Sequence, residues 1–436
     1  MSHPTVRGVV VLTRNGDHFG YAQNPYNYQS SHTECTPLGE VQAYELGQLL
    51  RDKYFTTSSP SYIKNIDPDL VDLDQVQIRI KNGGEGRVVF DSTIALLQGL
   101  FPPSKKNSIE LANETLVVAP LGGYQYVPAE TVEPSNDRSL ESWTDCPNFE
   151  KHTKEFYSSD DFKAAERHAS RFFAAANDFL FGHPAGLVNA YNVYDFMNHQ
   201  LTHNKSYAHR LPPTFIEQAR HWANFHEQGV FSDKQMAGIG NIAARTLMQA
   251  VISSLQRITY DGDPVQFILH STTYQPFISL FNMTEIPKED PSIYGIPDYA
   301  SALAIELRRG SLPDNRDFLR FMYKNGTGDF LPVHVFDHKG DVPLTEFIYR
   351  VESSVIANSK QWASTCGTVP PITLDGTDVT VQVTSAVAHC AVLAVILLLF
   401  STLFSFVRHR RQSSKRIRLP ATAQESLQHA PEKPRV

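Results

Sequence analysis

The residues that could do chemistry first appear directly after a short apolar run at 9–12. This run is rich in β-branched residues, which predicts a buried strand, and it ends at a polar Arg-Asn-Gly-Asp-His turn at 14–18. In open α/β sheets, ligands bind at the carboxyl ends of such strands. Because Arg14 stands close to Gly16, which lets the backbone approach a ligand, the turn suits an anion.

Several motifs resemble those of the histidine acid phosphatases, branch two of the histidine phosphatase superfamily. The family's first motif is Arg-His-Gly-x-Arg, and Arg14 and Gly16 match it. The phosphate-accepting histidine of that motif falls on Asn15, and its second arginine falls on His18. Other matching stretches bring the resemblance to roughly 9–367: they are 36–42, 99–103, 145–149 and 362–367.

The resemblance implies a two-step phosphoryl transfer in which a histidine takes the phosphoryl group, arginines bind its oxygens and an acid protonates the leaving alcohol. His270 corresponds to the family's second, phosphate-binding histidine, but the residue after it is Ser271 instead of an acid. A hydroxyl is a poor general acid, and the delocalised amide of Asn15 is no nucleophile. We therefore predict an acid phosphatase fold whose catalysis is impaired.

The resemblance also places a third phosphate-binding cation near the strand predicted at 76–81. Lys81 falls near the place at the strand end, while Arg87 fits the place that opens the next helix. Either cation, together with Arg14 and His270, would form a clamp for phosphate or a phosphomonoester, because such groups cancel charge on the phosphate oxygens. Which of the two faces the ligand is open.

Three functions remain open at this point. The preferred one is binding of phosphate or a phosphomonoester without efficient hydrolysis. In the second, the protein is a working acid phosphatase in which His18 or a residue of the cap replaces the nucleophile. His18 could instead bind phosphate as an imidazolium, and Asp17 could donate a proton instead of only capping the turn. In the third, the protein is a structural ectodomain whose pocket is a relic.

The sequence predicts no metal site and no cofactor. Its four cysteines lack the spacing of metal ligands, and no His-Glu-x-x-His motif occurs. A bridge between Cys146 and Cys366 is possible if the body of the protein is lumenal, and free cysteines are the alternative. The acidic body, with a net charge of −13 over 1–407, excludes a typical nucleic-acid binder.

The elements around these motifs predict an α/β fold, which the resemblance specifies as a phosphoglycerate-mutase-like sheet flanked by helices. Strands are expected at 9–12, 76–81, 265–270, 303–307 and 318–323, and helices at 40–55, 88–100, 274–281 and 344–362. Helices at 162–181 and 216–230 predict an inserted helical cap. The expected domains are an α/β body at 1–132 and 258–366, the cap at 133–257 and a linker at 367–384.

A transmembrane helix is predicted at 385–407, since 379–407 contains no Asp, Glu, Lys or Arg. The tail at 408–436 carries eight Lys and Arg against two Glu, which predicts a cytosolic tail and a lumenal or extracellular body. Asn-x-Ser/Thr sequons at Asn113, Asn204, Asn282 and Asn325 fit that side. The residues before the first strand do not read as a secretory signal, so either the true start lies upstream or the body is not translocated by a signal peptide; a tail anchor with a cytosolic body is the alternative topology.

Overall fold

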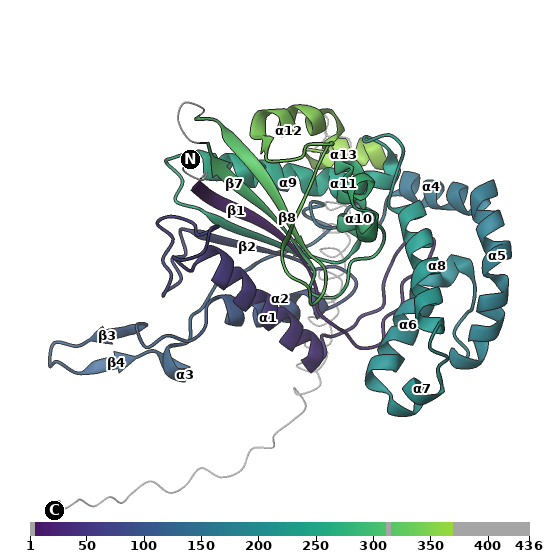
Figure 1. Ribbon diagram of the computed structural model, residues 1–436, viewed down its shortest axis with the longest axis horizontal. Coiled ribbons are helices and arrows are strands. Elements are labelled where there is room, and N and C mark those ends of the chain that lie inside the picture. The colour runs from purple at the N-terminus through teal and green to yellow at the C-terminus, as the bar shows by residue number, and fades with distance from the viewer. Residues whose placement is uncertain (1–4, 311–314, 369–436) are drawn as a thin grey trace, which may run out of the picture. The chain divides into compact units, whose positions relative to one another are not determined.

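A mixed β-sheet forms the centre of the computed structural model, which describes residues 5–310 and 315–368 (Figure 1). Within these residues the sheet has eight strands in the order β10-β8-β7-β1-β6-β2-β5, and β9 pairs with β8. Their bounds are β1 Thr5–Arg14, β2 Val76–Lys81, β5 Glu130–Val132, β6 Phe267–Thr272, β7 Ala302–Arg309, β8 Asp317–Lys324, β9 Leu331–Val333 and β10 Val342–Pro343. A separate hairpin, β3 (Ser108–Glu110) and β4 (Leu116–Val118), projects from the body.

Strand β1 is central because it pairs in parallel with β6 on one side and antiparallel with β7 on the other. Its side chains alternate between two apolar cores, with Val9 and Val11 in one and Val10 and Leu12 in the other. Burial on both faces explains why the sequence shows a continuous apolar run there. The end of β1 therefore has a fixed position, and the turn at 14–18 begins from it.

Helices cover both faces of the sheet. The first core includes residues of α1 and α2, and the second includes residues of α9, α10 and α12. The bounds are α1 Pro37–Tyr54, α2 Val88–Leu100, α3 Pro120–Gly123, α4 Pro147–Ser158, α5 Asp160–Ala176, α6 Ala190–His203, α7 Lys205–Arg210, α8 Phe215–Val230, α9 Ile242–Thr259, α10 Gln275–Thr284, α11 Ile286–Glu289, α12 Leu344–Val351 and α13 Ser359–Cys366.

The helices α4 to α8 lie together at one side of the sheet (Figure 1). They fall within the stretch predicted as a cap at 133–257. Helix α9, at the end of that stretch, packs against the sheet and is part of the body. Its residues Leu247, Val251 and Leu255 are buried in the same core as Val10. A disulfide joins Cys146, just before α4, to Cys366 at the end of α13, so of the two alternatives for these cysteines the bridge is confirmed.

The predicted helix at 344–362 is wrong in one respect, because the structure has two helices there. The first ends at Val351, and after a short 3-10 turn a new helix begins at Ser359. The side chain of Asn358 accepts a hydrogen bond from the amide of Gln361, and this cap starts α13.

Among the helices that the structure describes, none is long and apolar enough to cross a membrane. The predicted membrane helix at 385–407, like the linker and tail that flank it, lies outside the described residues.

Candidate functional site

The turn after β1 is held against the start of α1 by close backbone packing. A Cβ on Gly16 would lie 2.2 Å from the carbonyl oxygen of Gly39, so only glycine fits there. Thr36 caps α1 by accepting a hydrogen bond from the amide of Gly39, and its hydroxyl donates to the Asp17 carboxylate. The turn is therefore a fixed structure from which Arg14 and its neighbours project.

Arg14, the last residue of β1, is a buried cation without a carboxylate partner among the described residues. Its Nη1 donates to the carbonyl oxygen of Pro297, and the guanidinium lies 4.5 Å from the centre of the Tyr299 ring. Its Nε is buried and donates to no atom of the described chain. A buried guanidinium stays charged, so this residue supplies positive potential and spare donors.

A cavity of about 250 Å³ adjoins Arg14, and a second arginine, Arg220 of α8, also lines it. The Nη1 of Arg220 lies 2.5 Å from the Oδ1 of Asp298. The other carboxylate in the lining belongs to Asp17, which is 2.7 Å from the Nε2 of His203. Both carboxylates are thus engaged, and the residues lining this cavity include no histidine and no cysteine.

Asn15, at the position of the family's nucleophile, is buried in the turn. Its Nδ2 donates to the carbonyl oxygen of Gly16 at 2.8 Å, and its backbone bridges to Thr272 and Ala300. The amide therefore has a structural role in the turn, and the side chain does not line the Arg14 cavity.

His18 is buried with both ring nitrogens engaged. Its Nδ1 lies 2.8 Å from the carbonyl oxygen of Phe19, while its Nε2 lies 3.3 Å from the Asp195 carboxylate and 3.2 Å from the Tyr299 hydroxyl. Burial by itself would lower the pKa of His18, but the charge and hydrogen bond of Asp195 outweigh it and raise the pKa. The imidazole packs against the ring of Tyr299, which lines the Arg14 cavity, but does not line the cavity itself.

His270 does not join Arg14. In the register of β1 and β6 it lies opposite Leu12, whereas Arg14 lies opposite Thr272. Two residues along a strand correspond to about 7 Å, so His270 is set back from the strand end. It lines a different cavity, which shares no lining residue with the Arg14 cavity. The predicted clamp of Arg14 and His270 is therefore not assembled.

Ser271 points to the opposite face from His270, where it belongs to a small buried group of hydroxyls. Its Oγ accepts from Thr93 at 2.7 Å and from Thr13 at 3.1 Å. The Ser271 side chain therefore faces α2, and it does not line the Arg14 cavity.

The other two cations predicted for the clamp also have other partners. Lys81 is buried between Glu85 and Glu141, with its Nζ 2.6 Å from the Oε2 of Glu141. Burial by itself would lower the pKa of Lys81, but the charges and hydrogen bonds of Glu141 and Glu85 outweigh burial, so the pKa is raised. Arg87 is exposed and forms a surface ion pair with Glu34. Neither lines the cavity beside Arg14.

Two residues of the Arg14 site were missed in the sequence. Arg220 comes from α8, more than 200 residues after Arg14, and Tyr299 precedes β7. A tyrosine beside an arginine has no fixed spacing in sequence, so no motif signals this contact. Among the described residues, no group of three or more His, Cys, Asp and Glu side chains is arranged to hold a metal ion.

Comparison with known proteins identifies the family to which this fold belongs. Lysosomal acid phosphatase of Homo sapiens is 23% identical over 421 residues, covering 92% of this chain and 88% of that protein. Prostatic acid phosphatase of Bos taurus is 22% identical over 375 residues, covering 83% and 87%. The solved phytase from Citrobacter braakii shares the fold, with a TM-score of 0.55 at 11% identity over 82% of this chain and 99% of its own. Residues 9–324 match the family model, and the chain belongs to the histidine phosphatase superfamily (branch 2).

Proposed function

We propose that this protein binds a phosphate-like anion at Arg14 and does not hydrolyse phosphate esters efficiently. One observation carries the proposal: Arg14 is a buried cation without a carboxylate partner in the described chain, and it faces a cavity that no histidine or cysteine lines. Guanidinium groups suit phosphate geometry, which supports binding. A covalent transfer needs a nucleophile in line with phosphorus; the cavity lining has no histidine or cysteine for that role, and both of its carboxylates are held by other side chains.

The similar proteins fit the ligand class of this proposal. Their names describe acid phosphatases and phytases, and one solved Hafnia alvei phytase holds myo-inositol hexakis sulphate. A phosphate monoester is therefore the ligand class to test first at Arg14. The alternative in which His18 replaces the nucleophile requires a free ring nitrogen, and both nitrogens of His18 have partners. If instead the protein is only a structural ectodomain, it has no ligand at this site.

Thermal unfolding with and without inorganic phosphate tests binding, and turnover of p-nitrophenyl phosphate from pH 4 to 7 tests catalysis. We expect phosphate to stabilise the native protein and Arg14→Gln to abolish that effect, with no turnover in either protein. Arg87→Gln is the matched control, since it removes an equal charge from an exposed ion pair. Turnover that Arg14→Gln abolishes would refute the proposal, and a native protein that phosphate does not stabilise would favour the structural ectodomain.

We also propose a single membrane span at 385–407 with the body in a lumenal or extracellular compartment. The Cys146–Cys366 disulfide supports an oxidising compartment, because disulfides are rare in the cytosol. Protease protection of the body in intact microsomes, with the basic tail digested, is the expected result. A body that protease digests from the cytosolic side would favour the tail anchor.

A further inference from the structure

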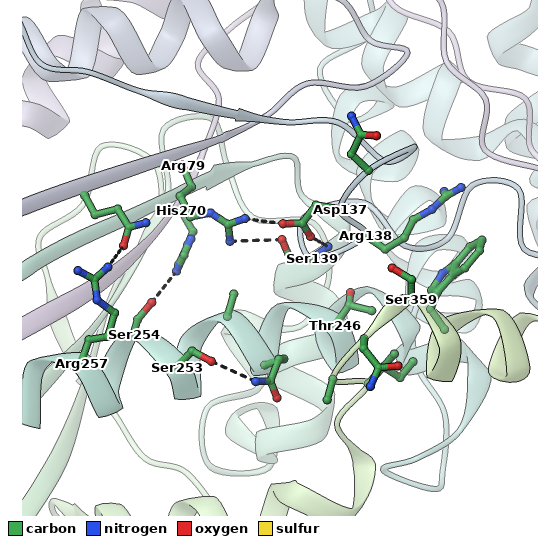
Figure 2. Close-up of a pocket in the computed structure, with 18 residues that line it drawn as sticks. Arg79, Asp137, Arg138, Ser139, Thr246, Ser253, Ser254, Arg257, His270 and Ser359 are labelled. Carbon is green, nitrogen blue, oxygen red and sulfur yellow. Dashed lines mark hydrogen bonds and ion pairs between the residues drawn. The ribbon is translucent and has the colours of Figure 1, made fainter. Parts of the chain in front are cut away.

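A second cavity, of about 410 Å³, lies on the sheet face between β2, β6 and α9 (Figure 2). Arg79 and His270 are register partners on β2 and β6, so their side chains emerge next to each other on that face. The loop at 136–139, the segment at 356–359 and Trp362 also line the cavity. Small-molecule sites have volumes of about 300–1,000 Å³, and this cavity falls in that range.

The helix α9 turns a polar stripe toward this cavity. Thr246, Gln249, Ser253, Ser254 and Arg257 all line it, and they recur at helical spacings of three and four residues. A helix that covers a sheet ordinarily fills the gap with apolar side chains. Here the apolar residues of α9 pack into the core, while its polar residues line an open space and offer hydrogen bonds to it.

Charges in the walls are compensated inside the protein. Each of the three arginines that line the cavity contacts a carboxylate. The pairs are Arg79 with Asp137 and Glu130, Arg138 with Asp145, and Arg257 with Asp263. Figure 2 shows Arg79 held between Asp137 and Ser139. The walls thus present oriented donors and acceptors, and no arginine of the lining lacks a counter-charge.

His270 and Ser254 form a hydrogen-bonded pair in the wall of the cavity. Burial and, next, the positive charge of Arg79 lower the pKa of His270 to about 3, so the ring is neutral. Its Nε2 lies 3.2 Å from the hydroxyl of Ser254, while its buried Nδ1 has no partner in the described chain. The neutral ring and the hydroxyl of Ser254 therefore give this wall uncharged hydrogen-bonding groups.

We propose that this cavity binds a neutral polyhydroxylated molecule of monosaccharide size. Hydroxyl, amide and paired guanidinium groups surround the space, and they match a ligand that both donates and accepts many hydrogen bonds. A charged ligand gains little here, because it would compete with carboxylates that already hold the arginines. The site is separate from Arg14 and does not depend on the function proposed there.

Binding of D-glucose and D-mannose to the full-length chain, measured by saturation-transfer NMR and calorimetry, tests the proposal. Cyclohexanol and D-glucuronate serve as comparison probes. We expect a neutral hexose to bind at least about tenfold more tightly than cyclohexanol, because the site is built for hydroxyls. Glucuronate should bind no more tightly than glucose. No hexose binding up to about 50 mM, or a clear preference for glucuronate, would overturn the proposal.

Two variants of α9 locate the site. Ser253→Phe fills the cavity and should weaken hexose binding at least about tenfold, since it replaces the space that the ligand needs. Gln256→Phe adds the same ring to an exposed position outside the lining and should leave binding unchanged. If Ser253→Phe does not fold, Gln249→Leu replaces it and should weaken binding in the same way. Binding that survives in a folded cavity variant would refute the assignment.

Discussion

Replacement of Lys81 by methionine distinguishes two roles for this residue, a structural ion pair with Glu85 and Glu141 or a cation that binds phosphate. Lys81 lies at the end of β2, and its side chain is 3% exposed, against 2% for Glu85 and 7% for Glu141. A phosphate ligand would need this ammonium to be free. The structure instead places it between two buried carboxylates, so Lys81→Met should leave two uncompensated charges in the interior.

Removing one partner of a buried ion pair typically costs about 3–5 kcal/mol. We expect Lys81→Met to lower the free energy of unfolding by about 3–5 kcal/mol at pH 7. The triple variant Lys81→Met, Glu85→Gln, Glu141→Gln removes the unpaired charges as well, and it should recover more than half of the loss. Urea unfolding followed by intrinsic fluorescence gives all three values.

The pH dependence gives a second measurement with a definite sign. Burial raises the pKa of Glu141, but the charge of Lys81 outweighs burial and lowers it from its ordinary value of 4.5. The pair therefore stabilises the native state above that value, and the contribution is lost as the pH falls through the lowered pKa. In Lys81→Met the Glu141 carboxyl loses this partner and takes up its proton at a higher pH, so the difference in stability from the native protein should shrink as the pH falls.

The result that would refute this reasoning is a loss below about 1 kcal/mol for Lys81→Met at pH 7, the value of a surface pair. A second contradictory result is that Lys81→Met abolishes stabilisation by phosphate while Arg14→Gln does not. Either result would indicate that Lys81 contacts the phosphate ligand.

Three further predictions follow from other parts of the chain. Asn15→His should not raise turnover of p-nitrophenyl phosphate, because no proton donor accompanies it; a tenfold or larger gain would contradict this. Cys146→Ser should lower the free energy of unfolding by about 2–5 kcal/mol, since the bridge to Cys366 closes a long loop; an unchanged urea midpoint would argue against the bridge. In a secretory host, mass spectrometry should find a glycan on exposed Asn113 and none on Asn282, whose Nδ2 donates to Asp233 and Asn241.

The sequence predicted the sheet well because its strands are buried on both faces. The apolar run at 9–12 lies within β1, the alternating stretch at 76–81 coincides with β2, and the motif match added the order of the elements. Where the prediction failed, the cause was local. Asn358 restarts a helix inside the segment 344–362, and a side-chain cap of this kind interrupts a pattern that periodicity alone reads as continuous.

The candidate site was harder to predict because it depends on register. The motif put His270 at the ligand edge, but β6 runs on to Thr272, which moves His270 back by two residues. Nothing in the composition of the strand tells where pairing ends. The charge state of Lys81 likewise depended on Glu141, a residue 60 positions away that the fold brings to 2.6 Å.

The family's reactive positions have become hydrogen-bonded parts of the structure in this chain. Asn15 bonds within its own turn, His18 has partners at both nitrogens, and Ser271 joins the hydroxyls of Thr13 and Thr93 on the other face. Each side chain would have to lose an interior contact before it could reach a ligand, and an unpaired buried polar group costs about 1–3 kcal/mol. We therefore expect that no single substitution at these positions produces efficient phosphoryl transfer, whereas the proposed anion binding at Arg14 requires no rearrangement of these contacts.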